Sequence, residues 1–273
     1  MYRESSRLPA PEGPGGPALF TYERRQRIFH LLEEQQRVTV PALSQLFLVS
    51  EVTIRKDLAW LESQKMAVRT HGGAILAAQV PTLPEMEFDV RESLHHSEKE
   101  RIGAAAAALV QDGETIYLDA STTALAMAPF LQTRRELTIV TNGLRIGMEL
   151  IGVPGVSVLM PGGMLRPESF SLVGNWGTAV MQQIHISKAF MGARGFTLQE
   201  GLTDVNNEEV ELKRTVVQIA REVIALIDYS KWGQVALATF CQSERIKTII
   251  TDKETPEEQI QQARSRGIEI VQV

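Results

Sequence analysis

Three stretches with hydrophobic residues at helical spacing follow one another between residues 22 and 63. In the first, residues 22–35, Ile28, Leu31 and Leu32 lie on one face, which predicts an amphipathic helix. The polar positions that we expect in solvent on this helix are Glu23, Arg24, Arg25 and Arg27. After a short β-prone run, a second helix is expected from Pro41, because proline suits the first turn of a helix.

The third stretch has the pattern of a recognition helix. Ser50 precedes it and can accept a hydrogen bond from a backbone N–H two or three residues later. The residues expected to face inward are Leu43, Leu46 and Phe47 on the second helix and Ile54, Leu58 and Leu61 on the third. The same spacing leaves Thr53, Arg55 and Lys56 outward near the start of the third helix, where a helix-turn-helix protein contacts base edges and phosphates.

A hairpin is expected directly after the third helix. Residues 66–74 consist of a strand, the Gly72–Gly73 turn and the start of a second strand, with Arg69 and His71 beside the turn. Each signal alone has a plainer explanation, since an Arg-Lys pair is typical of a solvated face and a glycine pair of any tight turn. Together, three helices and a hairpin gather the cations on one side, as contact with DNA phosphates requires. The pattern therefore predicts a winged helix-turn-helix domain over residues 21–76.

From residue 98 onward, helical stretches alternate with short β-prone runs. The expected helices are residues 98–110, 123–131 and 208–221, and the expected strands are residues 115–118, 137–140, 156–160, 188–191, 223–227, 248–250 and 268–271. This alternation predicts an α/β domain over residues 98–273, with a Rossmann-like, mostly parallel sheet covered by helices. Residues 77–97 contain Pro81 and Pro84 and show no clear period, so we expect a linker there.

Composition narrows the class of protein. With 44% hydrophobic and 22% charged residues in a chain of 273, the sequence is typical of a packed protein of about two domains. The longest apolar run, residues 102–110, is far shorter than the roughly 18 residues of a membrane helix. Residues 1–20 are rich in proline and glycine and lack the apolar core of a signal peptide, so we expect a disordered tail. Cys241 is the only cysteine, which excludes an intrachain disulfide and favours a cytoplasmic location.

Charge is distributed unevenly along the chain. Residues 21–76 hold eight Lys or Arg against six Asp or Glu, whereas residues 77–273 hold eighteen against twenty-five. A polyanion would therefore meet the first domain, although this balance by itself is a weak signal. His95, His96 and Glu98 lie on a segment without a period, where histidines are usually solvent-exposed, and we expect neither a metal site nor a cofactor.

Polar residues follow several of the predicted strands at their carboxyl ends, where parallel sheets bind ligands. Asp119 and Ser121–Thr123 lead from a strand directly into a helix, so hydroxyl and backbone N–H groups gather at a helix N-terminus that suits a phosphate. An ordinary serine or threonine cap explains the same residues equally well.

Three further strand ends carry candidate ligand residues. Asn142 is able to bind a sugar hydroxyl or only to fix a turn, and Gly162 and Gly163 either admit a ligand close to the backbone or only reverse the chain. Lys231, in a loop after a hydrophobic strand, either pairs with a phosphate or is a surface lysine. Residues 206–208 open a helix, where capping alone favours amide and acidic residues.

The string VSEVTIRKDLAWLESQKMAVRTHGGA resembles the DNA-binding signature of the deoxyribose-repressor (DeoR) family of bacterial transcription regulators. The chain keeps the family's basic pair and has Lys65 where the family often has glycine. The resemblance implies that the recognition helix reads the major groove and that the hairpin forms the wing. The DNA-binding residues implied in this way are Ser50, Thr53, Arg55, Lys56, Arg69 and His71.

The segments LDASTTALAM, IVTNGL, VLMPGG, MGARGFTLQEGLT and ALIDYSKWG are similar to the effector domain of the same family. That similarity implies a fold like ribose-5-phosphate isomerase and glucosamine-phosphate deaminase, and a phosphorylated sugar or related metabolite as effector. The effector-binding residues implied are Asp119, Ser121, Thr122, Thr123, Asn142, Gly162, Gly163 and Lys231. Where the isomerases have an acidic catalytic stretch, this chain has residues 191–195, which lack carboxylates.

The expected protein is a cytoplasmic DNA-binding transcription regulator, a repressor of a carbohydrate-metabolism operon. Its expected partners are double-stranded operator DNA, a phosphorylated sugar and further copies of itself, with no membrane and no catalytic residues. One alternative is an active sugar-phosphate isomerase or deaminase with a DNA-binding appendage, for which Asp119, Asp204 and Glu208 are the formal candidates. Another is an oligomeric scaffold whose α/β body serves only for assembly.

Overall fold

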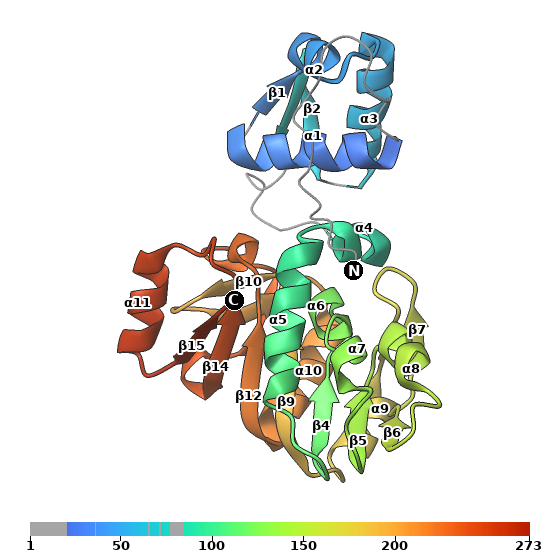
Figure 1. Cartoon of the computed structure of the whole chain (residues 1–273), viewed down its shortest axis with the longest axis vertical. Coiled ribbons are helices and arrows are strands. Elements are labelled where there is room, and N and C mark those ends of the chain that lie inside the picture. Colours follow the sequence, from blue (N-terminus) through green and yellow to red (C-terminus); the bar gives the residue numbers. More distant parts are fainter. Residues whose placement is uncertain (1–20, 36, 65, 71, 77–84) are drawn as a thin grey trace, which may run out of the picture. The chain divides into compact units, whose positions relative to one another are not determined.

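The computed structural model describes residues 21–35, 37–64, 66–70, 72–76 and 85–273 (Figure 1). The chain divides into two compact units, residues 1–77 and 78–273. The tail expected at residues 1–20, the predicted wing residue His71 and the first part of the expected linker lie outside the described residues.

The first unit combines three helices with a small antiparallel sheet. The helices are α1 (Thr21–Gln35), α2 (Val40–Phe47) and α3 (Glu51–Ser63). The strands are β1 (Arg37–Thr39), β2 (Ala67–Thr70) and β3 (Gly73–Leu76), in the order β1-β3-β2. The predicted helix-turn-helix and the hairpin that follows it are therefore both present, and β1 completes the sheet.

The core of the first unit forms where the sequence pattern places it, with two exceptions. The fully buried side chains include Ile28, Leu32, Leu43, Ile54, Leu58 and Leu61. Leu46 was expected inside but is 61% exposed. Arg24 was expected in solvent but is buried, and its Nε lies 2.6 Å from Asp57 Oδ2 on α3. Periodicity alone missed this ion pair because an arginine on an apolar face becomes favourable only when a buried carboxylate meets it.

The second unit is built on seven parallel strands. They are β4 (Thr115–Leu118), β5 (Leu137–Thr141), β6 (Val156–Leu159), β9 (Ile186–Gly192), β12 (Ala220–Leu226), β14 (Ile246–Thr251) and β15 (Glu269–Gln272). Their order is β15-β14-β12-β9-β4-β5-β6, and each neighbouring pair is parallel. The predicted parallel α/β sheet is thus confirmed.

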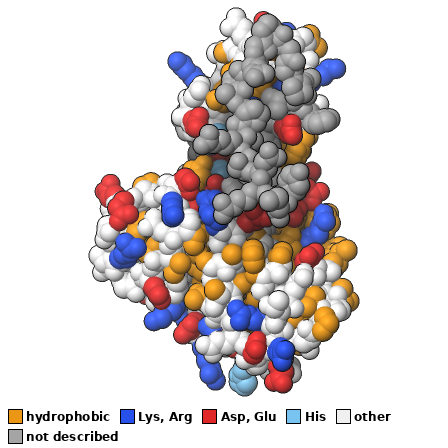
Figure 2. Space-filling view, in the orientation of Figure 1, with side chains coloured by type: hydrophobic (Ala, Val, Ile, Leu, Met, Phe, Trp, Pro, Cys, Tyr) orange, Lys and Arg blue, Asp and Glu red, His pale blue; other side chains and the backbone are white. Residues whose placement is uncertain are grey.

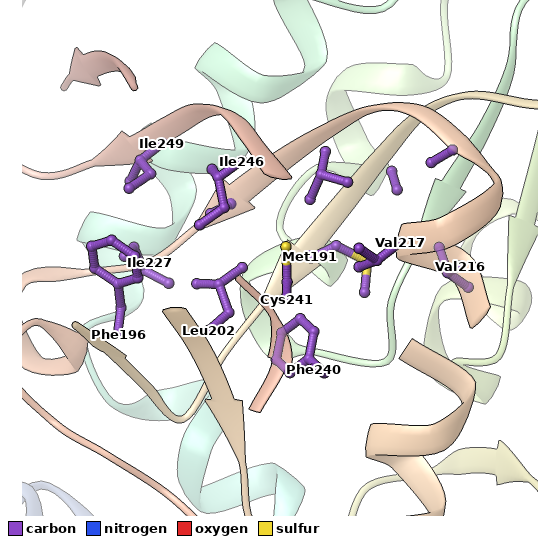
Figure 3. Close-up of a cluster of buried hydrophobic side chains, with 14 of the residues drawn as sticks. Met191, Phe196, Leu202, Val216, Val217, Ile227, Phe240, Cys241, Ile246 and Ile249 are labelled. Atoms are coloured by element: carbon purple, nitrogen blue, oxygen red, sulfur yellow. The ribbon is translucent and has the colours of Figure 1, made fainter. Parts of the chain in front are cut away.

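Both faces of this sheet are covered. On one face the core includes residues of α5 (His96–Ala108), α6 (Thr122–Leu125), α7 (Ala128–Leu131) and α8 (Leu144–Leu150). On the other it includes residues of α9 (Asn175–Met181), α10 (Asn207–Ile219), α11 (Glu257–Ser265) and a second sheet, β10 (Gly195–Thr197), β11 (Gly201–Asp204) and β13 (Ala238–Cys241). Figure 3 shows part of this second cluster, with Cys241 among Met191, Leu202 and Phe240. Burial raises the pKa of the Cys241 thiol to about 12.

The helix expected over residues 123–131 is broken in the structure. It forms two single turns, α6 and α7, with Pro129 in the first turn of α7. Proline has no N–H to donate to the carbonyl four residues earlier, and its ring clashes with that carbonyl. The helix that Ser121 caps is therefore only four residues long.

An ordered helix lies inside the segment that we expected to be a linker. It is α4 (Phe88–Ser93), and its Phe88 and Val90 are buried. Just before it, Glu85 accepts two hydrogen bonds from Arg166 Nη2, at 2.6 and 2.7 Å. Arg166 ends β7 (Met164–Arg166), which pairs with β8 (Ser171–Val173). The short length of α4 hides its period in the sequence.

Candidate functional site

The start of α3 brings together four of the residues predicted to contact DNA. The Ser50 Oγ accepts a hydrogen bond from the Thr53 backbone N–H at 3.2 Å, so Ser50 caps the helix. The two hydroxyl oxygens, Ser50 Oγ and Thr53 Oγ1, lie 2.9 Å apart. Arg55 and Lys56 follow on the exposed side, next to the buried residues Ile54 and Asp57.

The Arg55 guanidinium is held along the surface of its own helix. Its Nη2 donates to Glu51 Oε2 at 2.7 Å, and both side chains are about half exposed. Such an exposed pair contributes at most about 1 kcal/mol, so Arg55 exchanges it readily for a phosphate or a base. Beneath this surface, Asp57 accepts from Arg24 at 2.6 Å and from Arg25 at 2.9 Å, which joins α3 to α1.

The wing begins at a point where only glycine fits. A Cβ on Gly73 would lie 1.9 Å from the Val38 carbonyl oxygen of β1. Glycine therefore allows β3 to pair with β1 on one side and β2 on the other. Arg69, predicted to contact DNA, is part of β2 and pairs with Ala74 of β3.

In the second unit, Asp119 organises the carboxyl ends of two neighbouring strands. One carboxylate oxygen accepts from the Ser121 backbone N–H at 3.2 Å, and the other accepts from the Gly192 N–H at 3.0 Å. A Cβ on Gly192 would lie 2.4 Å from Ser121 Oγ, so glycine there lets the Ser121 loop pack against the end of β9. Asp119 is fully buried and has a structural partner for each oxygen.

A buried lysine completes this network. Lys213 on α10 places its Nζ 2.9 Å from Asp119 Oδ2 and 2.7 Å from Asp204 Oδ2, and donates to the Gly192 carbonyl at 3.0 Å. Burial by itself would lower the pKa of Lys213, but the carboxylates outweigh it and raise the pKa above its usual value. Burial would likewise raise the pKa of Asp204, and Lys213 and Arg194 instead hold it below the usual range.

Several of the other predicted effector residues already have hydrogen-bond partners within the protein. Ser121 caps α6 by accepting from the Ala124 N–H at 3.1 Å, and Thr122 and Thr123 are buried. Asn142 uses its amide internally, accepting from the Tyr117 hydroxyl at 2.7 Å and donating to the Leu172 carbonyl at 3.2 Å.

Gly162 and Gly163 follow β6, both with positive φ angles, of 82° and 133°. A Cβ on Gly163 would lie 2.3 Å from the Val173 carbonyl oxygen, whereas one on Gly162 would meet open space. Close backbone packing therefore explains the glycine at 163 without a ligand.

Lys231 lies after β12, in the short helix η2 (Tyr229–Lys231) that Asp228 caps. Its Nζ is 3.7 Å from Asp228 Oδ2 and donates to Ser230 Oγ at 2.9 Å. Burial would raise the pKa of Asp228, but Lys231, His95 and Lys99 lower it strongly. In the sheet, β12 and β4 are separated by β9, so Lys231 and the Ser121 loop follow strands about 10 Å apart.

Three cations that the sequence analysis did not select lie close to one another, and Lys231 acts on one of them, Lys99. Lys99 of α5 is buried, and desolvation lowers its pKa to about 7, with Lys231, Arg91 and Arg194 acting in the same direction and Asp228 against them. Arg91 of α4 has its pKa lowered to about 9, first by desolvation and then by Arg194. Its Nη2 is buried and makes no hydrogen bond within the described part of the chain. Glu209, Asp204 and Glu85 act on the pKa of Arg91 in the opposite direction, so carboxylates already offset part of the repulsion between these cations. A bound anion would offset more of it.

One sequence signal pointed to Lys99. It precedes Ile102 and Ala106 at spacings of three and seven residues, which places it on the buried stripe of α5. A lysine on such a stripe is rarely placed there for packing alone. Arg91 gave no comparable signal, because α4 is too short to show a period.

A cavity of about 250 Å³ lies between α5 and the α6–α7 turns. It is lined by Glu92, His96, Lys99, Glu100, Thr122, Leu125, Ala126, Pro129, Phe130 and Glu149. Three glutamates among these residues make it a poor site for a phosphate, although Thr122 and Lys99 share its wall. Within the described residues, no group of three or more His, Cys, Asp or Glu side chains is placed to hold a metal ion. No helix there is long and apolar enough to cross a membrane.

Two family models match the chain. The DeoR-like helix-turn-helix domain matches residues 24–80, and the DeoR C terminal sensor domain matches residues 94–253. The first match covers α3 and the hairpin, and the second covers the strand ends that carry Asp119, Asn142 and Lys231.

Two transcriptional regulators match most of this chain over most of their own length. The chain is 41% identical over 234 residues to the HTH-type transcriptional regulator GolR of Listeria innocua, covering 86% of this chain and 91% of that protein. It is 33% identical over 253 residues to the putative aga operon transcriptional repressor of Escherichia coli O157:H7, covering 93% and 94%. A solved structure of ribose 5-phosphate isomerase A from Methanocaldococcus jannaschii is similar at a TM-score of 0.37, with 18% identity over 50% of this chain and 54% of that chain.

Proposed function

Since this chain belongs to the DeoR family of bacterial transcription regulators, we propose that it represses a carbohydrate-metabolism operon under the control of a phosphorylated sugar. The first unit would bind operator DNA, and the second would bind the sugar phosphate. The observation that carries the DNA half is the start of α3, where Ser50, Thr53, Arg55 and Lys56 share one surface.

The roles within that surface follow from its geometry. A serine cap leaves the first backbone N–H groups of α3 at the surface, and the helix N-terminus attracts phosphate oxygens. Arg55 and Lys56 supply the charge, and Thr53 supplies a hydroxyl for a base edge or a phosphate. Arg69 and His71 would contact the adjacent backbone from the wing.

Footprinting on the chain's own promoter region tests this assignment. A protein with Arg55→Ala and Lys56→Ala should lose specific protection, since a base-contacting arginine contributes about 1–3 kcal/mol. Arg27→Ala is the matched control, because Arg27 is an exposed cation on α1 outside the proposed surface. A double variant that footprints like the wild type, or an Arg27→Ala protein that fails equally, would contradict the assignment.

The effector half is supported by a group of cations from α4, α5 and two strand-end loops. Lys231, Arg91 and Arg194 each disfavour the charged form of Lys99, and a bound anion would favour it. Ser121 and Thr122 belong to the neighbouring loop and would contact the phosphate or the sugar hydroxyls. Asp119, Asn142 and Gly163 support the shape of the site, because their polar or backbone neighbours already occupy them.

A thermal-shift screen of phosphorylated sugars tests the effector half. A true effector raises the melting temperature in proportion to RT ln(1 + [L]/Kd). Lys231→Ala should abolish that shift while operator binding persists, since it removes a point charge without touching α3. A Lys231→Ala protein that responds at the wild-type concentration would identify Lys231 as a surface lysine, and no shift with any phosphate would favour the scaffold alternative.

We propose that the chain does not catalyse sugar-phosphate isomerisation or deamination. Two of the three candidate carboxylates, Asp119 and Asp204, are bound to Lys213, and the third, Glu208, is exposed at the start of α10. A general base needs a carboxylate held over the sugar carbons. Turnover in a coupled assay with pentose and hexose phosphates, lost in a Glu208→Gln variant, would reverse this choice.

A homo-oligomer is part of the same proposal. One winged module contacts a modest stretch of DNA, so regulators of this kind place two modules on repeated half-sites. The cytoplasmic location expected from the single cysteine stays a prediction.

A further inference from the structure

The outward face of α3 contains a hydrophobic side chain. The structure describes every residue of this helix, and the exposed ones are Val52, Arg55, Lys56, Glu62 and Ser63. Val52 alone among them is hydrophobic, and it is 59% exposed. The sequence analysis selected its neighbour Thr53 instead, whose hydroxyl oxygen lies 2.9 Å from Ser50 Oγ. Val52 therefore belongs to the surface proposed to meet DNA, and no role has yet been given to it.

Val52 lies at the centre of this outward face. Successive residues of an α-helix are turned by about 100°, which places Val52 about 60° from Arg55 on one side and about 40° from Lys56 on the other. The buried side chains of Ile54 and Leu61 lie on the opposite side of the helix. Figure 2 shows Lys or Arg side chains projecting into solvent from the first unit, in the same orientation as Figure 1. The valine is thus flanked by the two cations that would hold the helix against phosphates.

The stability of α3 does not explain a valine at this position. A β-branched side chain loses rotamer freedom in a helix, and the first turn favours acidic residues such as Glu51. Val52 also adds little to the core, because more than half of its surface is exposed. Single exposed hydrophobic residues are common on proteins. This one, however, occupies the part of a recognition helix that faces base edges, since the N-terminal residues of such a helix enter the major groove.

The chemistry of the major groove leaves one group that a valine contacts favourably. Each base pair presents hydrogen-bond donors and acceptors there, and thymine adds its C5-methyl group. The side chain of valine has neither donor nor acceptor, so an apolar contact with that methyl group is the readout open to it. Phosphate contacts by neighbouring cations fix the register of the helix but carry no sequence information.

We propose that Val52 is a specificity-determining residue, which packs on the C5-methyl group of a thymine in the operator. The proposal rests on the proposed function for the position of α3 in the major groove. It adds the identity of a base to a surface that was otherwise described by its charge and its hydroxyl groups. Placed between Arg55 and Lys56, the valine would select thymine over cytosine at the same position, because cytosine has no methyl group and presents an amino group instead.

Uracil interference on the chain's own promoter region tests the proposal. A fragment that the wild-type protein protects is prepared with sparse deoxyuridine in place of thymine, which removes a methyl group and leaves the hydrogen-bonding groups of the base pair unchanged. Molecules bound by the full chain are separated from free ones in a gel, and the uracils in each fraction are mapped by cleavage. Uracil at the contacted thymine should weaken binding by about three- to tenfold, as expected for the loss of one buried methyl group.

Two defined duplexes, with thymine or uracil at the mapped position, then give a ratio of dissociation constants for each protein. Val52→Ala should bring this ratio close to unity, whatever its overall affinity, because the partner of the methyl group is gone. The variant should keep the wild-type melting temperature, since the side chain is mostly exposed and alanine is a better helix former. Leu46→Ala is the matched control. Leu46 is hydrophobic and 61% exposed but lies on α2, so this variant should keep the wild-type ratio.

The outcomes separate this proposal from the proposed function. A ratio that is lost in Val52→Ala and kept in Leu46→Ala supports the role of Val52. Three results overturn that role while leaving the chain a DNA-binding regulator: a protected fragment in which no uracil weakens binding, a Val52→Ala protein with the wild-type ratio, or a Leu46→Ala protein that loses the ratio equally. A wild-type protein that protects no promoter fragment overturns the DNA half of the proposed function, and the role of Val52 with it.

Discussion

Behind each proposed contact surface lies a buried carboxylate held by cations from another helix, but the two units balance that charge in opposite ways. In the first unit, one carboxylate, Asp57, is bound by two guanidinium groups, those of Arg24 and Arg25. In the second unit, one ammonium group, that of Lys213, is bound by two carboxylates, those of Asp119 and Asp204.

The difference bears on how each unit meets an anion. In the first unit, Asp57 meets two cations beneath the helix proposed to contact DNA. In the second, Arg194 Nε also lies 3.8 Å from Asp204 Oδ1, so the two carboxylates meet two cations and leave no surplus cation for the loop proposed to contact a phosphate. The cations needed there come from other elements, namely Arg91, Lys99, Arg194 and Lys231. Ser50 and Ser121 both cap helices, but only the helix that Ser50 caps carries its own exposed cations, Arg55 and Lys56.

The largest effect is expected from Lys213→Met. This change removes the ammonium group that both buried carboxylates, Asp119 and Asp204, contact, and breaking a buried pair in this way costs about 3–5 kcal/mol. Hydrogen exchange measured by mass spectrometry would show faster exchange throughout the second unit and little change in the first. Lys188→Met is the control, because Lys188 pairs with Glu114 alone and both are more exposed. Equal losses of stability in the two variants would mean that the Lys213 network stabilises the unit no more than the single Lys188–Glu114 pair does.

Asp57→Asn should give the next largest loss, of about 2–3 kcal/mol, since it removes the carboxylate charge that the buried Arg24 meets at 2.6 Å. The Arg25 guanidinium lies 4.7 Å from the centre of the Trp60 ring, so it retains one favourable contact. Exchange should now accelerate in α1 and α3 while the second unit is unaffected. If both units respond, the two networks are not independent.

Acid should destabilise the second unit through its buried carboxylates. The pKa values of Asp204 and of Glu209, a buried residue of α10 that accepts hydrogen bonds from Ser169 and Ser171, are lowered on folding. Their contribution to stability is therefore complete above their unfolded pKa values of about 4 and is lost as pH falls through the folded values. The free energy of unfolding of the second unit should therefore decrease steadily from pH 5 towards pH 2. Melting curves across this range check the slope, and Lys213→Met should flatten it. An unchanged slope in that variant would assign the acid sensitivity to other groups.

Lys99 gives a prediction for the effector with the opposite sign. Its pKa of about 7 means that it is largely neutral at pH 8, and a bound phosphate would favour its protonated form. Binding should then take up a proton and weaken by up to about tenfold per pH unit between pH 7 and 9, where the phosphate itself stays doubly charged. Calorimetry in buffers of different ionisation enthalpy measures the proton uptake. Lys99→Met should remove the pH dependence, and a variant that keeps it would exclude Lys99.

The smallest effects are expected at the two caps. Ser50→Ala and Ser121→Ala each remove one hydrogen bond to a helix N–H, which costs about 1 kcal/mol. The first change should weaken DNA binding without altering the effector shift, and the second should do the reverse. Gel shift and melting curves, measured on both proteins, check this division. A Ser121→Ala protein with a normal effector response would restrict Ser121 to capping.

The sequence predicted most of the framework because the framework is periodic. The winged helix-turn-helix and the parallel sheet follow from apolar spacing, and Ser50 and Ser121 are caps as expected. What periodicity could not predict is charge that is buried in pairs. Arg24 and Asp57 belong to different helices, and Lys213 meets Asp119 and Asp204 from distant parts of the chain, so no local pattern records them.

The candidate effector site was predictable only in outline. The sequence located the strand ends, because each follows a hydrophobic run. It did not show that side chains at these ends are already hydrogen-bonded to other parts of the chain. Asn142 gives both ends of its amide to neighbours that lie 25 and 30 residues away in sequence. Arg91 and Arg194 carry no local signal, since Arg91 lies in a helix of only six residues and Arg194 follows the end of β9.

The only cysteine of the chain, Cys241, is buried in the core of the second unit, so the reactivity of its thiol reports how often that unit opens locally. A thiol with a pKa of about 12 that solvent does not reach reacts with a disulfide reagent only while the surrounding strands are open. The rate of labelling at Cys241 therefore measures how often β13 separates from the core, without an engineered probe. A sugar phosphate that binds the closed form should slow this labelling, and operator DNA should slow it too if the two units communicate.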